Sequence, residues 1–197
     1  MGLKHEVLSS LKFADLSMGK IFTEKTINDL RNLGYGSVKA VDYCDHGSPN
    51  YDLILQDLKE TRGRTCVISD LDGFWLFFNK MNRYAIKSMG QMMNESSTFV
   101  IATNRPSTLN LSGFRDFFEL RNKKNPDKKF RIASRDINID LQKGPSIIKD
   151  ALTEHNNVFV LASSYLFDTS IMYYLANKID KVDLSKVHYR FTKHFLV

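Results

Sequence analysis

The sequence predicts an α/β fold in which a parallel β-sheet is covered by helices on both faces. Short runs that are apolar throughout recur along the chain, and a segment with helical periodicity separates each run from the next. Strands that are apolar at every position are typical of parallel sheets, which are buried on both faces and need helix-sized crossovers. The chain has 197 residues, of which 43% are hydrophobic, and this suits one domain with its own core.

The first 62 residues are expected to form a small α/β appendage, and residues 63–197 the main domain. Thr23 can cap a helix and Gly34 can end it, because hydroxyl side chains are favoured at helix starts and glycine just past helix ends. In chain order, the appendage is predicted to contain a helix over 23–34, a strand over 37–43, a helix over 51–60 and a connector over 61–64.

The main domain is predicted to alternate strands and helices. Its strands are the apolar runs, such as TCVIS at 65–69 and VFVLA at 158–162. Met89, Met92 and Met93 are expected to fill the core from one helix. The predicted strands cover 65–69, 98–102, 130–133, 158–162 and 187–191, and the predicted helices cover 84–93, 113–120, 145–155 and 169–178.

The composition excludes several classes of protein. Apolar runs such as 158–162 are far shorter than the ~20 residues that cross a bilayer, so no membrane partner is expected. The N-terminus lacks the pattern of a secretory signal, which predicts a cytoplasmic location. Cys44 and Cys66 are too few for a disulfide framework or a four-cysteine zinc site, and both are expected to be small buried residues.

The charge pattern is compatible with a polyanionic partner. The formal net charge is +6, and part of the excess is concentrated between Arg121 and Arg131 around a predicted turn at 125–127. This run is either a solvated loop or a surface that contacts nucleic-acid phosphates. Its candidate nucleic-acid-binding residues are Lys123, Lys124, Lys128, Lys129 and Arg131.

Polar side chains follow the predicted strands at the points where the strands end. Asp70 and Asp72 follow the first strand of the main domain, and Thr103 and Asn104 follow the second. Closely spaced carboxylates are costly unless they share a proton or a cation, whereas hydroxyl and backbone N–H groups suit phosphate oxygens. Because chemistry in parallel sheets gathers at the carboxyl ends of the strands, these groups are expected to converge there.

The order of these groups resembles the haloacid dehalogenase-like superfamily of phosphohydrolases. The resemblance covers about residues 65–178 and includes Asp70-Leu71-Asp72-Gly73 as the first motif, DxDG. Thr103 follows the next strand, Lys143 precedes a helix that leads to a further strand, and Asp168 follows that strand. The resemblance implies a Rossmann-like fold and a phosphatase that needs Mg²⁺ and acts on a phosphorylated substrate.

The resemblance also implies roles for the acidic residues. Asp70 would be the nucleophile that accepts the phosphoryl group as an aspartyl phosphate. Asp72 would protonate the leaving oxygen and then activate water. Mg²⁺ would be held by Asp70, Asp72 and Asp168.

The same resemblance assigns Thr103, Asn104 and Lys143 to the phosphoryl group. Thr103 and the backbone at Asn104 would bind the phosphoryl oxygens, and Lys143 would neutralise charge. The short spacings between the motifs leave no room for a large cap domain. An open site is therefore expected, which suits nucleotides or the ends of nucleic acids.

The sequence departs from the family's pattern in its last motif, where Ser164 replaces the first acid. Because a hydroxyl is a poorer Mg²⁺ ligand than a carboxylate, a second hypothesis stays open. In that hypothesis the chain is a scaffold without catalysis that binds nucleic acid or a transcription complex, as a phage-encoded regulator would. The aromatic residues after Gly73 are expected to pack in the core, or else Trp75, Phe77 or Phe78 could stack on a nucleobase.

Overall fold

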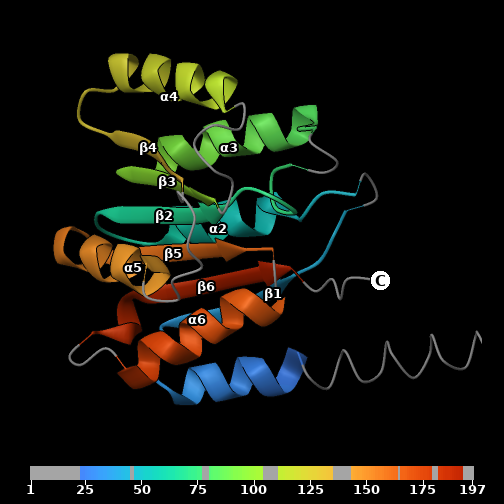
Figure 1. Ribbon diagram of the computed structural model, residues 1–197, viewed down its shortest axis with the longest axis vertical. Helices are drawn as coiled ribbons and strands as arrows, with labels where there is room; N and C mark the ends of the chain where they lie inside the picture. The colour runs from blue at the N-terminus through green and yellow to red at the C-terminus, as the bar shows by residue number, and fades with distance from the viewer. Residues whose placement is uncertain are drawn as a thin grey trace, which may run out of the picture.

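The computed structural model describes residues 23–44, 47–76, 80–103, 111–134, 143–163, 165–178 and 182–192. Its centre is a six-stranded sheet in the order β1-β6-β5-β2-β3-β4, in which every pairing is parallel (Figure 1). The predicted fold class, a Rossmann-like parallel sheet with helices on both faces, is confirmed. The strands are β1 (Ser37–Val41), β2 (Thr65–Asp70), β3 (Thr98–Thr103), β4 (Lys129–Ser134), β5 (Asn157–Ala162) and β6 (Val187–Thr192).

Helices cover both faces of the sheet because successive strand residues point to opposite sides. On one face, Val67, Phe99 and Phe159 pack in a cluster with helices α2, α3 and α4. On the other, Ile68 and Val160 pack in a second cluster with α5, α6 and the helix over 23–32. The helices are α2 (Tyr51–Glu60), α3 (Arg83–Glu95), α4 (Ser112–Lys124), α5 (Lys143–Glu154) and α6 (Tyr165–Lys178), and a 3₁₀ turn, η1 (Leu184–Lys186), precedes β6.

The sequence located most of these elements to within a few residues. Met89, Met92 and Met93 are all buried in α3, as expected. Cys66 is buried as predicted, whereas Cys44 is only partly buried. None of the helices in the described ranges is both long and apolar enough to cross a lipid bilayer.

The described part of residues 1–62 is built into the same body as the rest of the chain. Strand β1 pairs with β6 along its whole length, from Ser37 opposite His188 to Val41 opposite Thr192. Helix α2 buries Tyr51, Ile54, Leu55 and Leu58 in the cluster that also contains α3. Strand β1 ends at Val41, before the predicted end at Tyr43, because the chain then turns back and Tyr43 forms an antiparallel bridge with Pro49.

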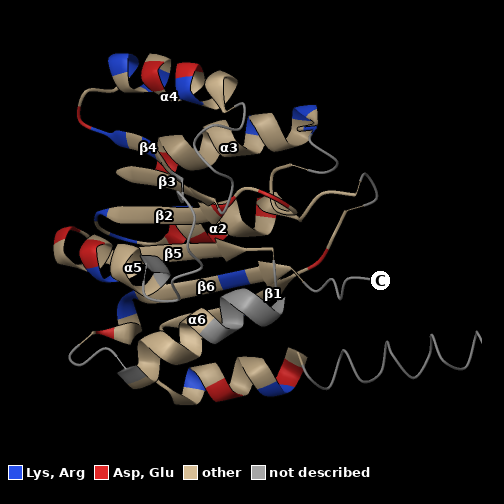
Figure 2. Cartoon of the chain, viewed as in Figure 1, with Lys and Arg blue, Asp and Glu red and all other residues tan. Residues whose placement is uncertain are grey.

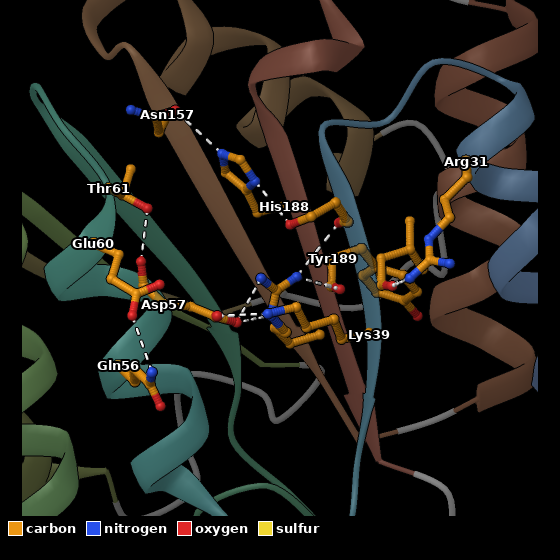
Figure 3. Close-up of polar contacts among 12 residues, drawn as sticks. Arg31, Lys39, Gln56, Asp57, Glu60, Thr61, Asn157, His188 and Tyr189 are labelled. Atoms are coloured by element: carbon orange, nitrogen blue, oxygen red, sulfur yellow. Dashed lines mark hydrogen bonds and ion pairs between the residues drawn. The ribbon is translucent and has the colours of Figure 1, made fainter.

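A buried charge in β6 ties α2 to the sheet (Figure 3). The side chain of Arg190 is only 3% exposed, and its Nη2 lies 2.7 Å from Oδ2 of Asp57 on α2. Lys39 on β1 also reaches this carboxylate, with Nζ 2.6 Å from Oδ1. Burial alone would raise the pKa of Asp57, but the hydrogen bond with Lys39 and the charge of Arg190 hold it below its ordinary value. The Asp57 carboxylate therefore offsets the desolvation cost of the buried Arg190 guanidinium.

His188 completes this polar layer without adding charge. Its ring stacks on Phe159 with centroids 4.7 Å apart. The ring nitrogens lie 2.9 Å from Ser37 Oγ and 3.1 Å from Asn157 Oδ1, the latter contact labelled in Figure 3. Burial, followed by the nearby positive charge of Arg190, lowers the pKa of His188 to about 4. At neutral pH the imidazole is therefore uncharged, so one ring nitrogen donates and the other accepts.

The Asp57 pairing can be tested by removing the carboxylate. Asp57→Ala should lower the free energy of unfolding by about 3–5 kcal/mol, because it leaves the buried Arg190 charge without its partner. Glu60→Ala is the control on the same helix, since Glu60 is exposed and accepts only from Gln56, and it should change stability by no more than about 0.5 kcal/mol. Urea unfolding at pH 7 measures both. Equal losses for the two variants would contradict this account of Arg190.

Candidate functional site

The sheet has one point where the connections reverse direction, between β5 and β2. From β2 the chain proceeds outward through β3 to β4, whereas β5 leads to β6 on the opposite side of β2 (Figure 1). In open parallel sheets, neighbouring crossovers diverge at such a point and leave a crevice at the carboxyl ends of the strands, where ligands bind. Asp70 is the last residue of β2, so it lies at this reversal point.

Both oxygens of the Asp70 carboxylate accept hydrogen bonds from the chain. The backbone N–H of Leu71 donates to Oδ1 at 2.8 Å, and the Ser163 hydroxyl, just past β5, donates to Oδ2. Burial raises the pKa of Asp70 to about 6, the two hydrogen bonds oppose this, and the charge of Asp72 raises it further. The site therefore holds an oriented carboxylate that titrates near neutrality beside a second carboxylate.

The loop after β2 is a tight turn that is anchored in the core. The Leu76 N–H donates to the Leu71 carbonyl at 3.0 Å, and the Gly73 N–H donates to the Leu76 carbonyl at 2.9 Å. The Trp75 indole stacks on Tyr51 with centroids 4.7 Å apart, and both side chains are fully buried. These contacts hold the turn that carries Asp72.

The aromatic residues after Gly73 pack in the core where the structure describes them. Phe74 and Trp75 are both 0% exposed, so packing is confirmed for them and stacking on a nucleobase is excluded for Trp75. Trp75 Nε1 donates to Ser69 Oγ at 2.6 Å, and that hydroxyl lies 3.0 Å from the Asp70 carbonyl oxygen. Phe77 and Phe78 lie outside the described residues.

Glycine is required at position 73 for two physical reasons. Its φ of +73° lies in the left-handed region, and a Cβ there would be 3.1 Å from the Ser163 Cβ. The Ser163 carbonyl accepts from the Thr192 hydroxyl at 3.1 Å, and the Gly73 carbonyl accepts from the Tyr43 hydroxyl at 3.1 Å. The turn after β2 therefore packs directly on the end of β5.

Ser163, Thr192 and Tyr43 were not predicted as site residues. Ser163 gave a usable signal, because it is the polar residue directly after an apolar run. Thr192 and Tyr43 gave none, because only the strand order brings the ends of β6 and β1 to the Asp70 edge.

Thr103 is placed at the predicted edge, but on the other side of the sheet from Asp70. It is the last residue of β3, is 4% exposed, and lies one position beyond Ala102, the register partner of Asp70. Neighbouring strands are about 4.8 Å apart, so the two strand ends are adjacent. By strand alternation, however, Thr103 follows Ile101 on the α3 side, whereas Asp70 points to the opposite side. Asn104 lies outside the described residues.

Lys143 and Asp168 both lie near the start of a helix. Lys143 is the first residue of α5, which follows β4, and Asp168 lies in the first turn of α6, which follows β5. Helices that follow parallel strands begin at the carboxyl edge, so both residues start from the Asp70 end. Their side chains, like Ser164 as a whole, lie outside the described part of the structure.

A metal ion would find oxygen donors at two of the described residues, the Asp70 carboxylate and the backbone carbonyl of Asp72. Asp70 and Asp72 supply oxygen donors, the kind of ligand that Mg²⁺ prefers, and their mutual repulsion is what a cation would relieve. Among the described residues, no group of three or more His, Cys, Asp or Glu forms a candidate metal centre. The described residues therefore supply part of a possible cation site and do not complete one.

The basic run lies at the opposite end of the sheet from Asp70. The expected loop is instead the last turn of α4, a turn at 125–128 and the start of β4, because α4 continues to Lys124. Basic residues are favoured in the last turn of a helix by its dipole. Figure 2 shows these Lys and Arg segments at the amino ends of the strands. Lys129 begins β4 and lies five residues, or about 17 Å, from Ser134 at the carboxyl edge.

Several charges of this run have partners within the chain. Lys128 Nζ lies 3.4 Å from the Met93 carbonyl oxygen and also bonds the Asn94 carbonyl, at the end of α3. Lys129 Nζ lies 3.4 Å from Glu154 Oε2, and both residues line a pocket of about 170 Å³. Lys123, Lys124 and Arg131 are exposed. The pocket and the run are thus both remote from Asp70.

Comparisons with protein-family models, curated proteins and solved structures found no match to this chain. Function is therefore inferred from the geometry of the Asp70 site.

The raised pKa of Asp70 predicts a pH-dependent effect on stability. Because the folded protein holds the Asp70 proton more tightly than the unfolded chain, ionisation costs stability as the pH rises through about 6. Asp70→Asn removes this cost. The free energy of unfolding of Asp70→Asn minus that of the wild type should therefore be about 1–3 kcal/mol more favourable at pH 8 than at pH 4. Urea unfolding in EDTA buffer at both pH values measures this difference. Any effect of the substitution that does not depend on pH is the same at pH 4 and pH 8 and drops out of the comparison. Parallel pH curves for the two proteins would contradict the raised pKa.

Proposed function

We propose that this chain is a phosphohydrolase of the haloacid dehalogenase-like type that acts through Asp70. The observation that carries the proposal is the Asp70 carboxylate itself. It ends a central strand at the reversal point of the sheet, both its oxygens accept hydrogen bonds, and a second carboxylate follows two residues later. A restrained carboxylate in a crevice is the arrangement that nucleophilic attack on a phosphoryl group needs.

The proposed reaction has two steps. In the first, an Asp70 oxygen attacks phosphorus to form an aspartyl phosphate, and the leaving oxygen takes a proton from Asp72. In the second, Asp72 removes a proton from water, the water oxygen attacks phosphorus, and phosphate leaves as the Asp70 carboxylate is regenerated. Asp70 must be ionised to attack, and its pKa of about 6 allows this at neutral pH.

Mg²⁺ would neutralise charge on the carboxylates and on the phosphoryl group. Asp70, the backbone carbonyl of Asp72, and Asp168 are the groups proposed to hold it. Asn104 and Lys143 are proposed to bind the phosphoryl oxygens, whereas Thr103, whose side chain faces α3, is not retained in this role. The positions of Lys143 and Asp168 at the starts of α5 and α6 support this arrangement.

Short connections at the carboxyl edge support an open site. The connection from β2 to α3 covers residues 71–82, and that from β3 to α4 covers 104–111. Neither is long enough to form a domain over the crevice. An open crevice suits a phosphate at the end of a large molecule, so nucleotides or nucleic-acid ends are the proposed substrate class.

Turnover of p-nitrophenyl phosphate in the presence of Mg²⁺ tests the proposal. Asp70→Asn should lower kcat by at least about 10³-fold, because it removes the nucleophile, and EDTA should have a similar effect. Asp150→Asn is a matched control, since this exposed carboxylate lies on α5 beside the remote pocket, and it should leave kcat unchanged. Equal turnover by Asp70→Asn and the wild type would rule out the covalent mechanism.

A second candidate function is nucleic-acid binding by the basic run, which the exposure of Lys123, Lys124 and Arg131 favours. Replacing all three by alanine should weaken binding to duplex DNA. A plot of the logarithm of the binding constant against the logarithm of the salt concentration should also be less steep. Its slope should change by about 0.9 for each phosphate that the variant no longer neutralises. Fluorescence anisotropy at several salt concentrations measures both. Because the run is remote from Asp70, Asp70→Asn should bind like the wild type. Binding that does not depend on salt would argue against this function.

A further inference from the structure

Hydrogen bonds from Tyr43, just past β1, and from Thr192, at the end of β6, hold the two segments that flank the Asp70 carboxylate. The Tyr43 hydroxyl donates to the Gly73 carbonyl at 3.1 Å, and the Thr192 hydroxyl donates to the Ser163 carbonyl at 3.1 Å. Ser163 in turn donates through its side chain to Asp70. The two side chains are neighbours, because burial raises the pKa of Tyr43 and the side chain of Thr192 opposes this effect.

These contacts restrain Ser163 from both sides. Its carbonyl is held by Thr192, and its Cβ lies against Gly73, where an added Cβ would approach to 3.1 Å. Its Oγ also lies against Gly73, 3.3 Å from the position that a Cβ there would take, so the turn limits rotation of the hydroxyl as well. The hydroxyl therefore stays on Asp70 Oδ2, while the Leu71 N–H holds Oδ1.

The turn that carries Asp72 does not depend on Tyr43 for its folding. On its core side, the Tyr51 hydroxyl donates to the Phe74 carbonyl, and Trp75 bonds to Ser69 Oγ at 2.6 Å. Removal of the Tyr43 hydroxyl leaves these hydrogen bonds intact. Its expected effect is therefore on the orientation of Gly73 and Ser163 rather than on the presence of the turn.

We propose that Tyr43 and Thr192 are positioning residues, which act through Ser163 to orient the Asp70 carboxylate. This inference rests on the proposed function for its catalytic consequence. It assigns a role to strand β1, which delivers Tyr43 to the carboxyl edge by pairing with β6. The outer strand of the sheet thus contributes to the site at its centre.

A double-mutant cycle between Tyr43→Phe and Ser163→Ala tests the inference with p-nitrophenyl phosphate and Mg²⁺. Tyr43→Phe should lower kcat about 10-fold and Ser163→Ala about 10–100-fold, because misplacement of a nucleophile lowers the rate of the chemical step. KM should change less than about 2-fold, since the groups proposed to bind phosphate are untouched. The double variant should be no slower than Ser163→Ala alone, because Tyr43 acts through Ser163.

Tyr173→Phe is the matched control. The Tyr173 hydroxyl is partly buried and donates to Asp29 Oδ2 at 3.3 Å, between α6 and the helix over 23–32. Tyr173→Phe removes a tyrosine hydroxyl as Tyr43→Phe does, but away from Asp70, and should leave kcat unchanged. Additive losses in the cycle, or equal losses for Tyr43→Phe and Tyr173→Phe, would overturn the inference.

Amide hydrogen exchange at Leu71 tests the inference without any turnover. The Leu71 N–H donates to Asp70 Oδ1, so its exchange rate reports whether the carboxylate stays in place. Tyr43→Phe should raise this rate at least about 3-fold, and Tyr173→Phe should not. An unchanged rate in Tyr43→Phe overturns the positioning role. A raised rate in a protein without phosphatase activity supports that role and refutes the proposed function instead.

Discussion

Burial of the sheet on both faces is the constraint on which the rest of the structure depends. The side chains of the central strands have almost no place for charge, so polar groups are confined to the strand ends or must bring a partner. Arg190 is a buried charge that brings a partner, because its guanidinium lies inside the structure in β6 and is paired with Asp57. Asp70 is a charge at a strand end, since it ends β2 where the connections of the sheet reverse. The location of the candidate site is thus a consequence of how the sheet is covered.

The sequence predicted those features that local pattern controls. Uninterrupted apolar runs identified the buried strands, and the acids directly after 65–69 marked the end of β2, where the candidate site lies. What local pattern does not contain is the order of the strands. Ser163 meets Asp70 because β5 lies beside β2, and Tyr43 reaches Gly73 because β1 pairs with β6. The opposite facing of Thr103 and Asp70 likewise follows from register, which the sequence did not supply.

The basic run shows how composition can conceal structure. Lys and Asn around a predicted turn favoured a solvated loop, yet α4 continues to Lys124 and β4 begins at Lys129. Tertiary packing explains the difference, because Phe118 is buried and Asn122 bonds both the N–H and the carbonyl of Phe130. The charges thus lie on rigid elements at the end of the sheet remote from the acids. The two proposed functions therefore occupy separate surfaces.

Trp75 is the single tryptophan of the chain, and its surroundings make it a built-in optical reporter of the crevice. Its indole is fully buried against Tyr51 and bonds the Ser69 hydroxyl, which lies 3.0 Å from the Asp70 carbonyl oxygen. Any displacement of the end of β2 alters the environment of this one fluorophore. Occupancy of the crevice by an ion or a phosphate can therefore be followed from the emission of the unlabelled protein, without interference from other indoles.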